Sequence, residues 1–205
     1  MRPNGRGLNR LRQPPATLAL MGRLPKYPSP DEPLVLTPIG VVRSPFRTHA
    51  GTPRQASIAP ATTGEIVLRA GMQNCLVDLA RFSHVWVLYW FNYSVGWNQQ
   101  VRPPRDTKKR GVFATRAPHR PNPIGLSVLR LVSVRGTTLR VEGLDMLDGT
   151  PVLDLKPYVP YADSIQEANH GWLEDLGART GPDHRLARPP VRHRALARDP
   201  RKLDA

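Results

Sequence analysis

The sequence contains a single cysteine and no apolar run long enough to span a membrane. Cys75 alone excludes an internal disulfide and a metal cage built only from thiolates. The apolar residues 16–21 are too few for a membrane span and lack a signal-peptide cleavage region. We therefore expect a cytoplasmic chain with no membrane and no metal, although the acid-poor, arginine-containing N-terminus is also compatible with an organelle transit peptide.

Several motifs of common enzymes are absent as well. The sequence has no Gly-x-Gly-x-x-Gly, no Walker loop, no His-Glu-x-x-His, no paired cysteines and no Gly-x-Ser-x-Gly, and its histidines are scattered. These absences leave a doubly wound nucleotide-binding fold, a zinc site and a serine hydrolase without support.

Acidic residues are few, so the formal net charge is +14, with 30 Lys/Arg against 16 Asp/Glu. Residues 1–30 hold six basic residues and no acid, and residues 178–205 hold eight against three. Ends of this kind are typical of disordered segments that contact phosphates, or of tails that only aid solubility. We expect a disordered leader at 1–32, a folded domain at 33–168, and a partly disordered basic tail at 169–205.

The 23 prolines disfavour long helices and central strands. Short apolar or alternating segments predict strands at 34–42, 64–69, 85–91, 111–115, 126–134, 138–144 and 151–155. Residues 72–81 predict one or two helical turns. The run at 85–91 predicts a strand buried on both faces, and 138–144 alternates with Leu139 and Val141 inward. The fold class is mainly β: a barrel-like sheet with few short helices and disordered basic tails.

Residues 116–125 form a stiff connection, because three of these ten residues are prolines. A stiff loop can present Arg116, His119, Arg120 and Asn122 to a ligand without an ordering cost, or it can simply connect two strands.

Three carboxylates, Asp145, Asp148 and Asp154, lie within ten residues of an otherwise basic chain. At the end of a hairpin they can hold ribose hydroxyls or a cationic amino group. Asp148, which precedes a glycine, can equally be a turn former alone.

A basic stretch precedes and overlaps the stiff loop. It contains Arg102, Arg105, Lys108, Lys109, Arg110, Arg116 and Arg120. Only Asp106 opposes it, so it favours a polyanion beside the site or else forms a solvated face.

Together these segments resemble the TsaA-like (TrmO) family over residues 34–165. The motifs are Thr-Pro-Ile-Gly-Val-Val-Arg-Ser-Pro at 37–45, Pro-Arg-Gln at 53–55, Phe-Ser-His-Val-Trp at 82–86, Arg-Pro-Pro-Arg at 102–105, the whole of 111–125, and Asp-Gly-Thr-Pro-Val-Leu-Asp-Leu-Lys-Pro-Tyr at 148–158. The resemblance implies an S-adenosylmethionine-dependent methyltransferase on a single-sheeted β-barrel. It further implies a homodimer that acts on N6 of threonylcarbamoyladenosine at position 37 of a tRNA.

The resemblance also implies site residues. For the cofactor they are Pro53, Arg54, Gln55, Phe91, Asn92, Arg116, Leu126, Asp145, Met146, Leu147, Asp148 and Gly149. For the tRNA substrate we expect Arg105, Lys108, Lys109, Arg110, His119, Arg120 and Asn122. The acceptor of the N6 proton is expected among Asp148, Asp154 and Tyr158.

The sequence departs from the family pattern at residues 106–109, where Asp-Thr-Lys-Lys stands in place of Leu-Gly-Gly-Asn. The additional C-terminal domain of better-known members is also not recognisable after residue 165. Two other functions stay open: a non-catalytic RNA-binding barrel, and a hydrolase that uses Asp145 and Asp154.

Overall fold

The computed structural model describes residues 33–104 and 106–180 of the chain. The chain divides into the units Met1–Val35 and Leu36–Ala205, and every strand lies in the second. The expected leader at 1–32, Arg105 and the expected tail beyond residue 180 lie outside the described residues.

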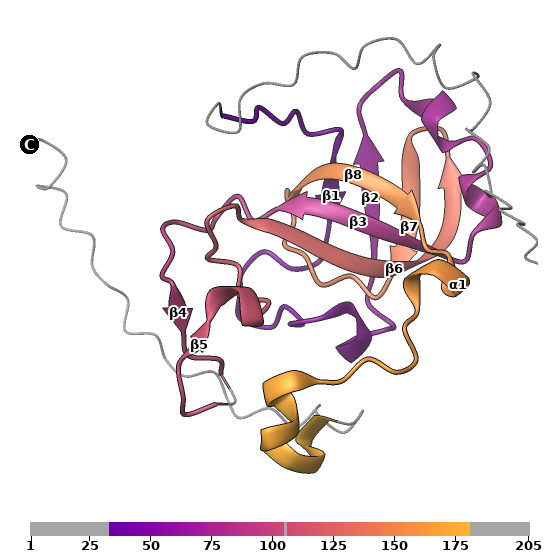
Figure 1. Ribbon diagram of the computed structural model, residues 1–205. Helices are drawn as coiled ribbons and strands as arrows, with labels where there is room; N and C mark the ends of the chain where they lie inside the picture. Colours follow the sequence, from indigo (N-terminus) through magenta and orange to yellow (C-terminus); the bar gives the residue numbers. More distant parts are fainter. Residues whose placement is uncertain (1–32, 105, 181–205) are drawn as a thin grey trace, which may run out of the picture. The chain divides into compact units, whose positions relative to one another are not determined.

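Six strands close into one barrel, in the order β1-β2-β7-β6-β3-β8 (Figure 1). They are β1 Gly40–Arg43, β2 Thr63–Leu68, β3 His84–Trp90, β6 Ile124–Arg135, β7 Thr138–Glu142 and β8 Pro151–Pro157. All neighbouring pairs are antiparallel. The prediction of a mainly β, single-sheeted barrel is confirmed.

The barrel interior is apolar, because alternate residues of each strand point inward. Fully buried side chains include Val42 on β1, Ile66 on β2, Val87 on β3 and Leu129 on β6. On β7, Leu139 and Val141 are buried and Arg140 is exposed, which confirms the predicted alternation.

Strands β6 and β7, which match the strands predicted at 126–134 and 138–144, form a hairpin with Arg135 paired to Thr138. Gly136 in the turn has a φ of 59°, in the left-handed region that glycine adopts at little cost. The register shifts between Leu131 and Ser133, an irregularity that no sequence pattern had indicated.

Strand β3 is buried on one face only, so the prediction of burial on both faces is wrong for a single chain. Val85, Val87 and Tyr89 are buried, whereas the side chains between them are half-buried and Trp90 is 44% exposed. In a closed barrel one face lines the core, and the other faces outward.

Two other strand predictions need correction. The strand expected at 111–115 is wrong: β5 Arg110–Gly111 pairs with β4 Gln100–Val101, and the chain then turns into the 3₁₀ helix η5 Val112–Ala114. The strand expected from residue 34 begins only at Gly40, after Pro38, which has no N–H to donate to a ladder.

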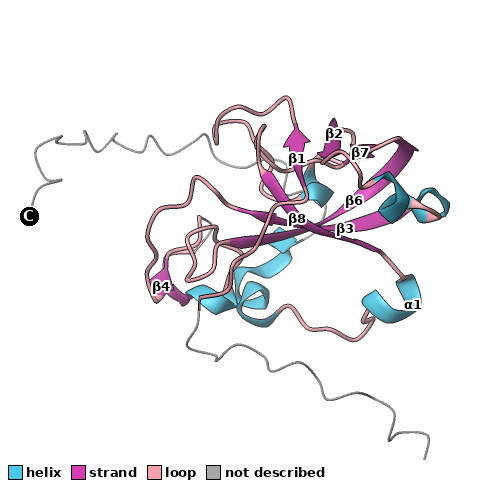
Figure 2. Cartoon of the chain, turned by 90° about the horizontal axis from the view of Figure 1, so that it is seen from above, coloured by secondary structure: helices cyan, strands magenta, loops and turns pink. Residues whose placement is uncertain are grey.

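The helices are short and lie in the connections between strands and after the last one (Figure 2). Besides η5 they are η2 Ala56–Ile58, η3 Gln73–Leu76, η4 Leu79–Arg81, α1 Pro160–Asp163 and η6 Gly171–Thr180. Helices η3 and η4 are the turns predicted at 72–81. Helix η6 lies within the range that we expected to be tail.

Within residues 33–104 and 106–180, no helix is both long and apolar enough to cross a bilayer. In the same ranges, no three His, Cys, Asp or Glu side chains are grouped as ligands for a metal ion.

Candidate active site

A chain of hydrogen bonds joins three elements at one end of the barrel. Ser127 on β6 donates its hydroxyl to the carboxylate of Asp145, with its Oγ 2.9 and 3.0 Å from the two carboxylate oxygens. The hydroxyl of Tyr89, on β3, lies 3.3 Å from the same Oγ. Because the serine proton is directed to Asp145, the tyrosine donates to the serine.

Gly125 makes room for this tyrosine. It pairs with Tyr89 across β6 and β3, and a Cβ at this glycine would overlap ring atoms Cε2 and Cζ of Tyr89. Phe91 packs edge-on against the tyrosine, with ring centroids 5.1 Å apart. The backbone N–H of Phe91 donates to the carbonyl of Pro123 at 2.8 Å, so the proline-rich loop and the end of β3 are joined.

Asp145 lies in the connection between β7 and β8, where it is half-buried. Burial raises the pKa of its carboxyl, although the Ser127 hydroxyl, the Ala56 backbone N–H and the charge of Arg116 lower it in part. An ionised Asp145 is therefore under-compensated, and a cationic group beside it would be stabilised.

Tyr89 shows the same effect on a phenol. Burial is the main cause of its raised pKa, and the neighbouring Asp145 charge adds to it. The phenol therefore stays neutral near pH 7 and acts as a hydrogen-bond donor at the base of the site.

The loop at 116–125 is held by its own polar groups. Arg120 Nη1 donates to the carbonyls of Val112, Thr115 and Ala117 at 3.3, 2.8 and 3.4 Å. At the other side of the loop, the Ser94 hydroxyl donates to the Pro118 carbonyl at 3.0 Å. The same hydroxyl lies 2.8 Å from Nδ1 of His119. Arg116 is exposed, and its charge acts on both Asp145 and Tyr89.

Asp148 ties the turn before β8 to the end of β1. Its Oδ1 accepts the backbone N–H of Ser44 at 3.1 Å, and its own N–H donates to the carbonyl of Phe46 at 2.7 Å. Gly149 follows with a φ of 78° and donates to the carbonyl of Val42 at 2.9 Å. These bonds give Asp148 a role in holding the turn, whatever else it does.

Asp154 and Tyr158, the other candidate proton acceptors, lie on β8 and directly after it. The strand position of Asp154 pairs with Leu88, the residue before Tyr89. Asp154 is paired with Lys156 at 2.7 Å and borders a hollow of about 390 Å³ between β8 and helices η3 and η4. Tyr158 packs against Trp86 and His84 at the far end of β3 from Tyr89. Tyr89 is five positions after His84 on this strand, a rise of about 17 Å at 3.3–3.4 Å per residue.

The remaining predicted cofactor residues have mixed surroundings. Pro53, Arg54 and Gln55 lead into η2, whose first residue, Ala56, contacts Asp145. Asn92 and Leu147 are half-buried, Met146 is in the core, and Leu126 is 55% exposed on the outer face of β6. The structure therefore brings Phe91, Arg116 and Ala56, which follows the 53–55 loop, to the Tyr89–Asp145 end, and turns Met146 into the core and Leu126 to the outer face.

The predicted substrate residues also divide. Lys108, Lys109, His119 and Asn122 are exposed, whereas Arg110 and Arg120 are bound to other parts of the chain. Arg105 lies outside the described residues.

Sequence reasoning missed Tyr89 and Ser127, the two residues that connect Asp145 to the core. Both occupy inward positions of strands that are otherwise apolar, between or beside residues such as Val87 and Leu129. The sequence could have indicated them, because each is a polar residue at a position of the strand that points into the barrel, and a buried hydroxyl needs a hydrogen-bond partner.

Comparisons with known proteins agree with this architecture. Residues 41–164 match the family model of the tRNA-methyltransferase O N-terminal domain. A probable S-adenosyl-L-methionine-binding protein of Pyrococcus abyssi is 45% identical over 137 residues, which cover 67% of this chain and 74% of that protein. The tRNA (adenine(37)-N6)-methyltransferase of Escherichia coli is 39% identical over 150 residues, 68% of this chain and 64% of that enzyme.

Among solved structures, TrmO from Pseudomonas aeruginosa matches with a TM-score of 0.60 and 42% identity, over 68% of this chain and 62% of that one. The chain thus covers less than two thirds of the E. coli and P. aeruginosa proteins. With the matched barrel domain and these identities, the chain belongs to the tRNA-methyltransferase O family.

Proposed function

We propose that this protein binds S-adenosylmethionine at the Tyr89–Asp145 end of the barrel and methylates N6 of adenine 37 in a tRNA. Its relatives include proteins named for S-adenosylmethionine binding and for this methyl transfer. The observation that carries the proposal in this chain is the half-buried, under-compensated carboxylate of Asp145 beside the exposed Arg116.

These residues fit the cofactor's chemistry. S-adenosylmethionine carries a sulfonium, an ammonium and a carboxylate, so it needs an anionic partner, a cationic partner and an apolar surface. Asp145 supplies the first, Arg116 the second and the Phe91 ring the third. A cation next to Asp145 would also relieve the cost of its burial.

The bound cofactor supplies an electrophilic methyl group, and this chain's residues must orient the acceptor nitrogen and exclude water. Position 37 lies in a single-stranded loop, where bases are read by stacking and by their exposed edges. The N6 nitrogen loses a proton when it gains the methyl group. Asp148 is the acceptor that we propose, because it lies in the same β7–β8 connection as Asp145. Asp154, whose strand position pairs with Leu88 next to Tyr89, is the second candidate. Tyr158 packs against Trp86 and His84 at the other end of β3 and does not fit this role within one chain. The proposal includes a threonylcarbamoyl group on the N6 nitrogen of the substrate.

A homodimer is the second part of the proposal. The outer faces of β3 and β6 carry three apolar cross-strand pairs, Trp86–Val128, Leu88–Leu126 and Trp90–Ile124. Trp90, Ile124 and Leu126 are each more than 40% exposed. A contiguous apolar strip of this kind marks an interface, and a second copy of the chain is the partner that we propose.

Leu126→Glu should convert the dimer to a monomer, as measured by light scattering. A wild-type protein that is itself a monomer would reject the proposed dimer.

The charge distribution supports a polyanionic substrate. The basic ends of the sequence and the exposed Lys108 and Lys109 attract phosphates, with an affinity that falls as salt rises.

The test is to incubate the purified protein with methyl-labelled S-adenosylmethionine and total tRNA, and then to digest the RNA and identify the labelled nucleoside. We expect label on N6 of a position-37 adenosine derivative, and none with the Asp145→Ala variant. The exposed Arg135→Ala serves as the matched active control. RNA binding without any label would instead support a non-catalytic binding module. If tRNA that lacks threonylcarbamoyl groups receives no label, the enzyme requires that group on its substrate.

A further inference from the structure

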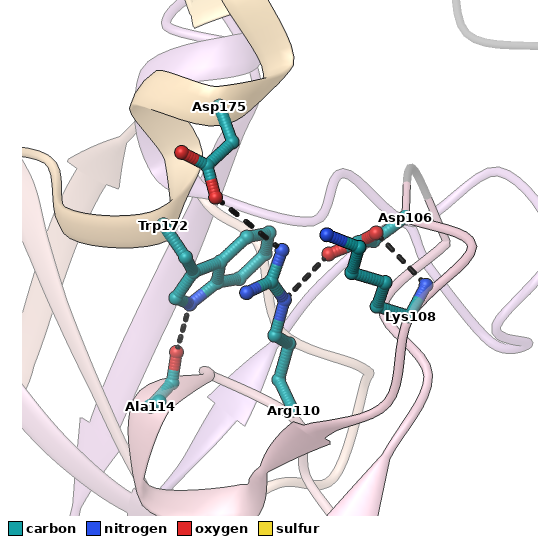
Figure 3. A network of polar contacts seen from close by, with 6 residues as sticks. All are labelled: Asp106, Lys108, Arg110, Ala114, Trp172 and Asp175. Atoms are coloured by element: carbon teal, nitrogen blue, oxygen red, sulfur yellow. Dashed lines mark hydrogen bonds and ion pairs between the residues drawn. The ribbon is translucent and has the colours of Figure 1, made fainter.

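Arg110, counted above among the expected tRNA contacts, is enclosed by a network from three segments (Figure 3). Its Nε donates to Asp106 Oδ2 at 2.7 Å, and its Nη2 lies 3.8 Å from Asp175 Oδ2. Its guanidinium carbon lies 4.8 Å from the centre of the Trp172 ring, at cation–π distance. The edge and one face of the guanidinium are therefore already occupied.

Trp172 is fixed to the part of the chain that follows Arg110. Its indole Nε1 donates to the carbonyl of Ala114, in η5, at 2.8 Å. Helix η5 is itself held to the 116–125 loop, because Arg120 donates to the carbonyl of Val112. The start of η6 is ordered by local bonds as well, since the His170 N–H donates to Glu174 at 2.9 Å.

The segment that Trp172 contacts through Arg110 is the turn between β4 and β5, which is short and basic. Strands β4 and β5 share only two residue pairs, too few for a ladder that is stable alone. Asp106 folds the turn between them by accepting the Lys108 backbone N–H at 2.9 Å in addition to Arg110. These two contacts are the largest causes of the lowered pKa of its carboxyl.

We propose that Trp172, Asp175 and Asp106 form a clasp around Arg110 that orders the 106–110 turn and so presents Lys108 and Lys109 to tRNA phosphates. Arg110 is in this view a positioning residue and not a phosphate ligand. The inference rests on the proposed function for its substrate. Its physical advantage is pre-organisation, because a turn that is already ordered binds without a further entropy cost.

Salt dependence separates positioning from contact. Each lysine that neutralises a phosphate contributes about 0.7–0.9 to the slope of log K against log salt concentration. We expect Lys108→Ala and Lys109→Ala to lower this slope for tRNA binding. Trp172→Ala and Arg110→Ala should weaken binding about 3- to 10-fold with the slope unchanged, and their double variant should be no weaker than either single variant.

The conservative variant sharpens this test. Arg110→Lys keeps the charge but loses the planar fork that contacts Asp106 and Trp172 together. A positioning role predicts that it weakens tRNA binding as much as Arg110→Ala does. In turnover the KM for tRNA should rise while kcat and the affinity for S-adenosylmethionine stay within about twofold. Arg135→Ala, at an exposed arginine outside the network, is the control.

Three results would overturn the proposal: a reduced salt slope in Arg110→Ala, full rescue by Arg110→Lys, or an unchanged KM for tRNA in Trp172→Ala. If Trp172→Ala fails to fold, Trp172→Phe keeps a ring face and loses only the bond to Ala114. If the wild-type protein neither binds nor methylates tRNA, the proposed function fails. Amide exchange at residues 106–111 then tests the clasp alone: exchange no faster in Trp172→Ala would reject it.

Discussion

Two aspartates of this protein have pKa values displaced in opposite directions. At the barrel end, burial raises the pKa of Asp145, and its partners compensate only in part. In the clasp, the Lys108 backbone N–H and the Arg110 side chain lower the pKa of Asp106. Asp106 has its cation four residues away at 2.7 Å, whereas the arginine near Asp145 is exposed.

The difference separates a ligand site from a structural contact. A carboxylate that already has its donors and a cation gains little from a ligand, and its bonds order the chain around it. A carboxylate kept partly desolvated without full compensation gains most from a cation that arrives in solution. We therefore propose a binding role for Asp145 and a positioning role for Asp106.

The largest effect is expected from a substitution that disturbs the packing under Asp145. In Gly125→Ala the new Cβ would overlap the Tyr89 ring, so the tyrosine or strand β6 must shift. We expect a loss of about 1–3 kcal/mol in the free energy of unfolding, or more, measured by denaturant titration.

Gly111→Ala is the matched control, because no atom lies within 4 Å of a Cβ at that position in β5. An equal loss of stability in both variants would contradict the close packing of the barrel end.

The next effect concerns the cation beside Asp145. Arg116→Ala should weaken S-adenosylmethionine binding by about 1.5–3 kcal/mol, or roughly 10- to 150-fold, because a hydrogen bond to a charged group is lost. Calorimetry measures the affinity directly, and Arg69→Ala, another exposed arginine, should not change it. An unchanged affinity in Arg116→Ala would remove Arg116 from the site.

Asp145→Asn should raise stability while it lowers cofactor affinity. The raised pKa means that the folded state binds this proton more tightly than the unfolded state does. Asp145 therefore lowers stability progressively as pH rises from its unfolded pKa through its folded pKa.

The asparagine removes that penalty and still accepts the Ser127 hydrogen bond. We expect a gain of about 0.5–2 kcal/mol at neutral pH and a flatter pH dependence of thermal unfolding. A loss of stability that is equal at pH 4 and pH 7 would argue against a buried, under-compensated charge.

The smallest effect is expected at Asp106, with the opposite sign. Its lowered pKa means that the ionised form contributes stability above its unfolded pKa, and that this contribution is lost as pH falls through the folded pKa. In Asp106→Asn, the protection of the amides at residues 106–111 against exchange, relative to the intrinsic rate at each pH, should be lower at pH 7 and no longer decrease on acidification. Exchange that matches the wild type at pH 7 would contradict the role of this carboxylate in the turn. Asp78→Asn, at an exposed aspartate, is the control.

Much of the fold could be predicted from local sequence. The alternation of Leu139 and Val141 with polar neighbours indicated β7, and the glycine at 136 indicated the turn before it. The strand expected at 111–115 failed because its apolar residues belong to a 3₁₀ turn that is held by Arg120, a contact that no local pattern contains.

The candidate site was predictable only in part. The motif segments at 116–125 and 145–149 contain Arg116 and Asp145, and the segment at 53–55 directly precedes Ala56, whose backbone N–H contacts Asp145. The proposed roles of those residues stay predictions. Ser127 and Tyr89, which hold Asp145, lie in strands whose apolar composition suggested only core.

Local sequence was enough to predict the β class, the alternation of β7, the stiffness of the proline-rich loop and the family motifs, because these depend on neighbours along the chain. Only the tertiary structure decided that Ser127 meets Asp145 and that Trp172 encloses Arg110. Those contacts join residues 18 and 62 positions apart, and their geometry depends on strand register, barrel closure and the docking of η6. Register and closure are settled by packing of the whole core, which no local segment encodes.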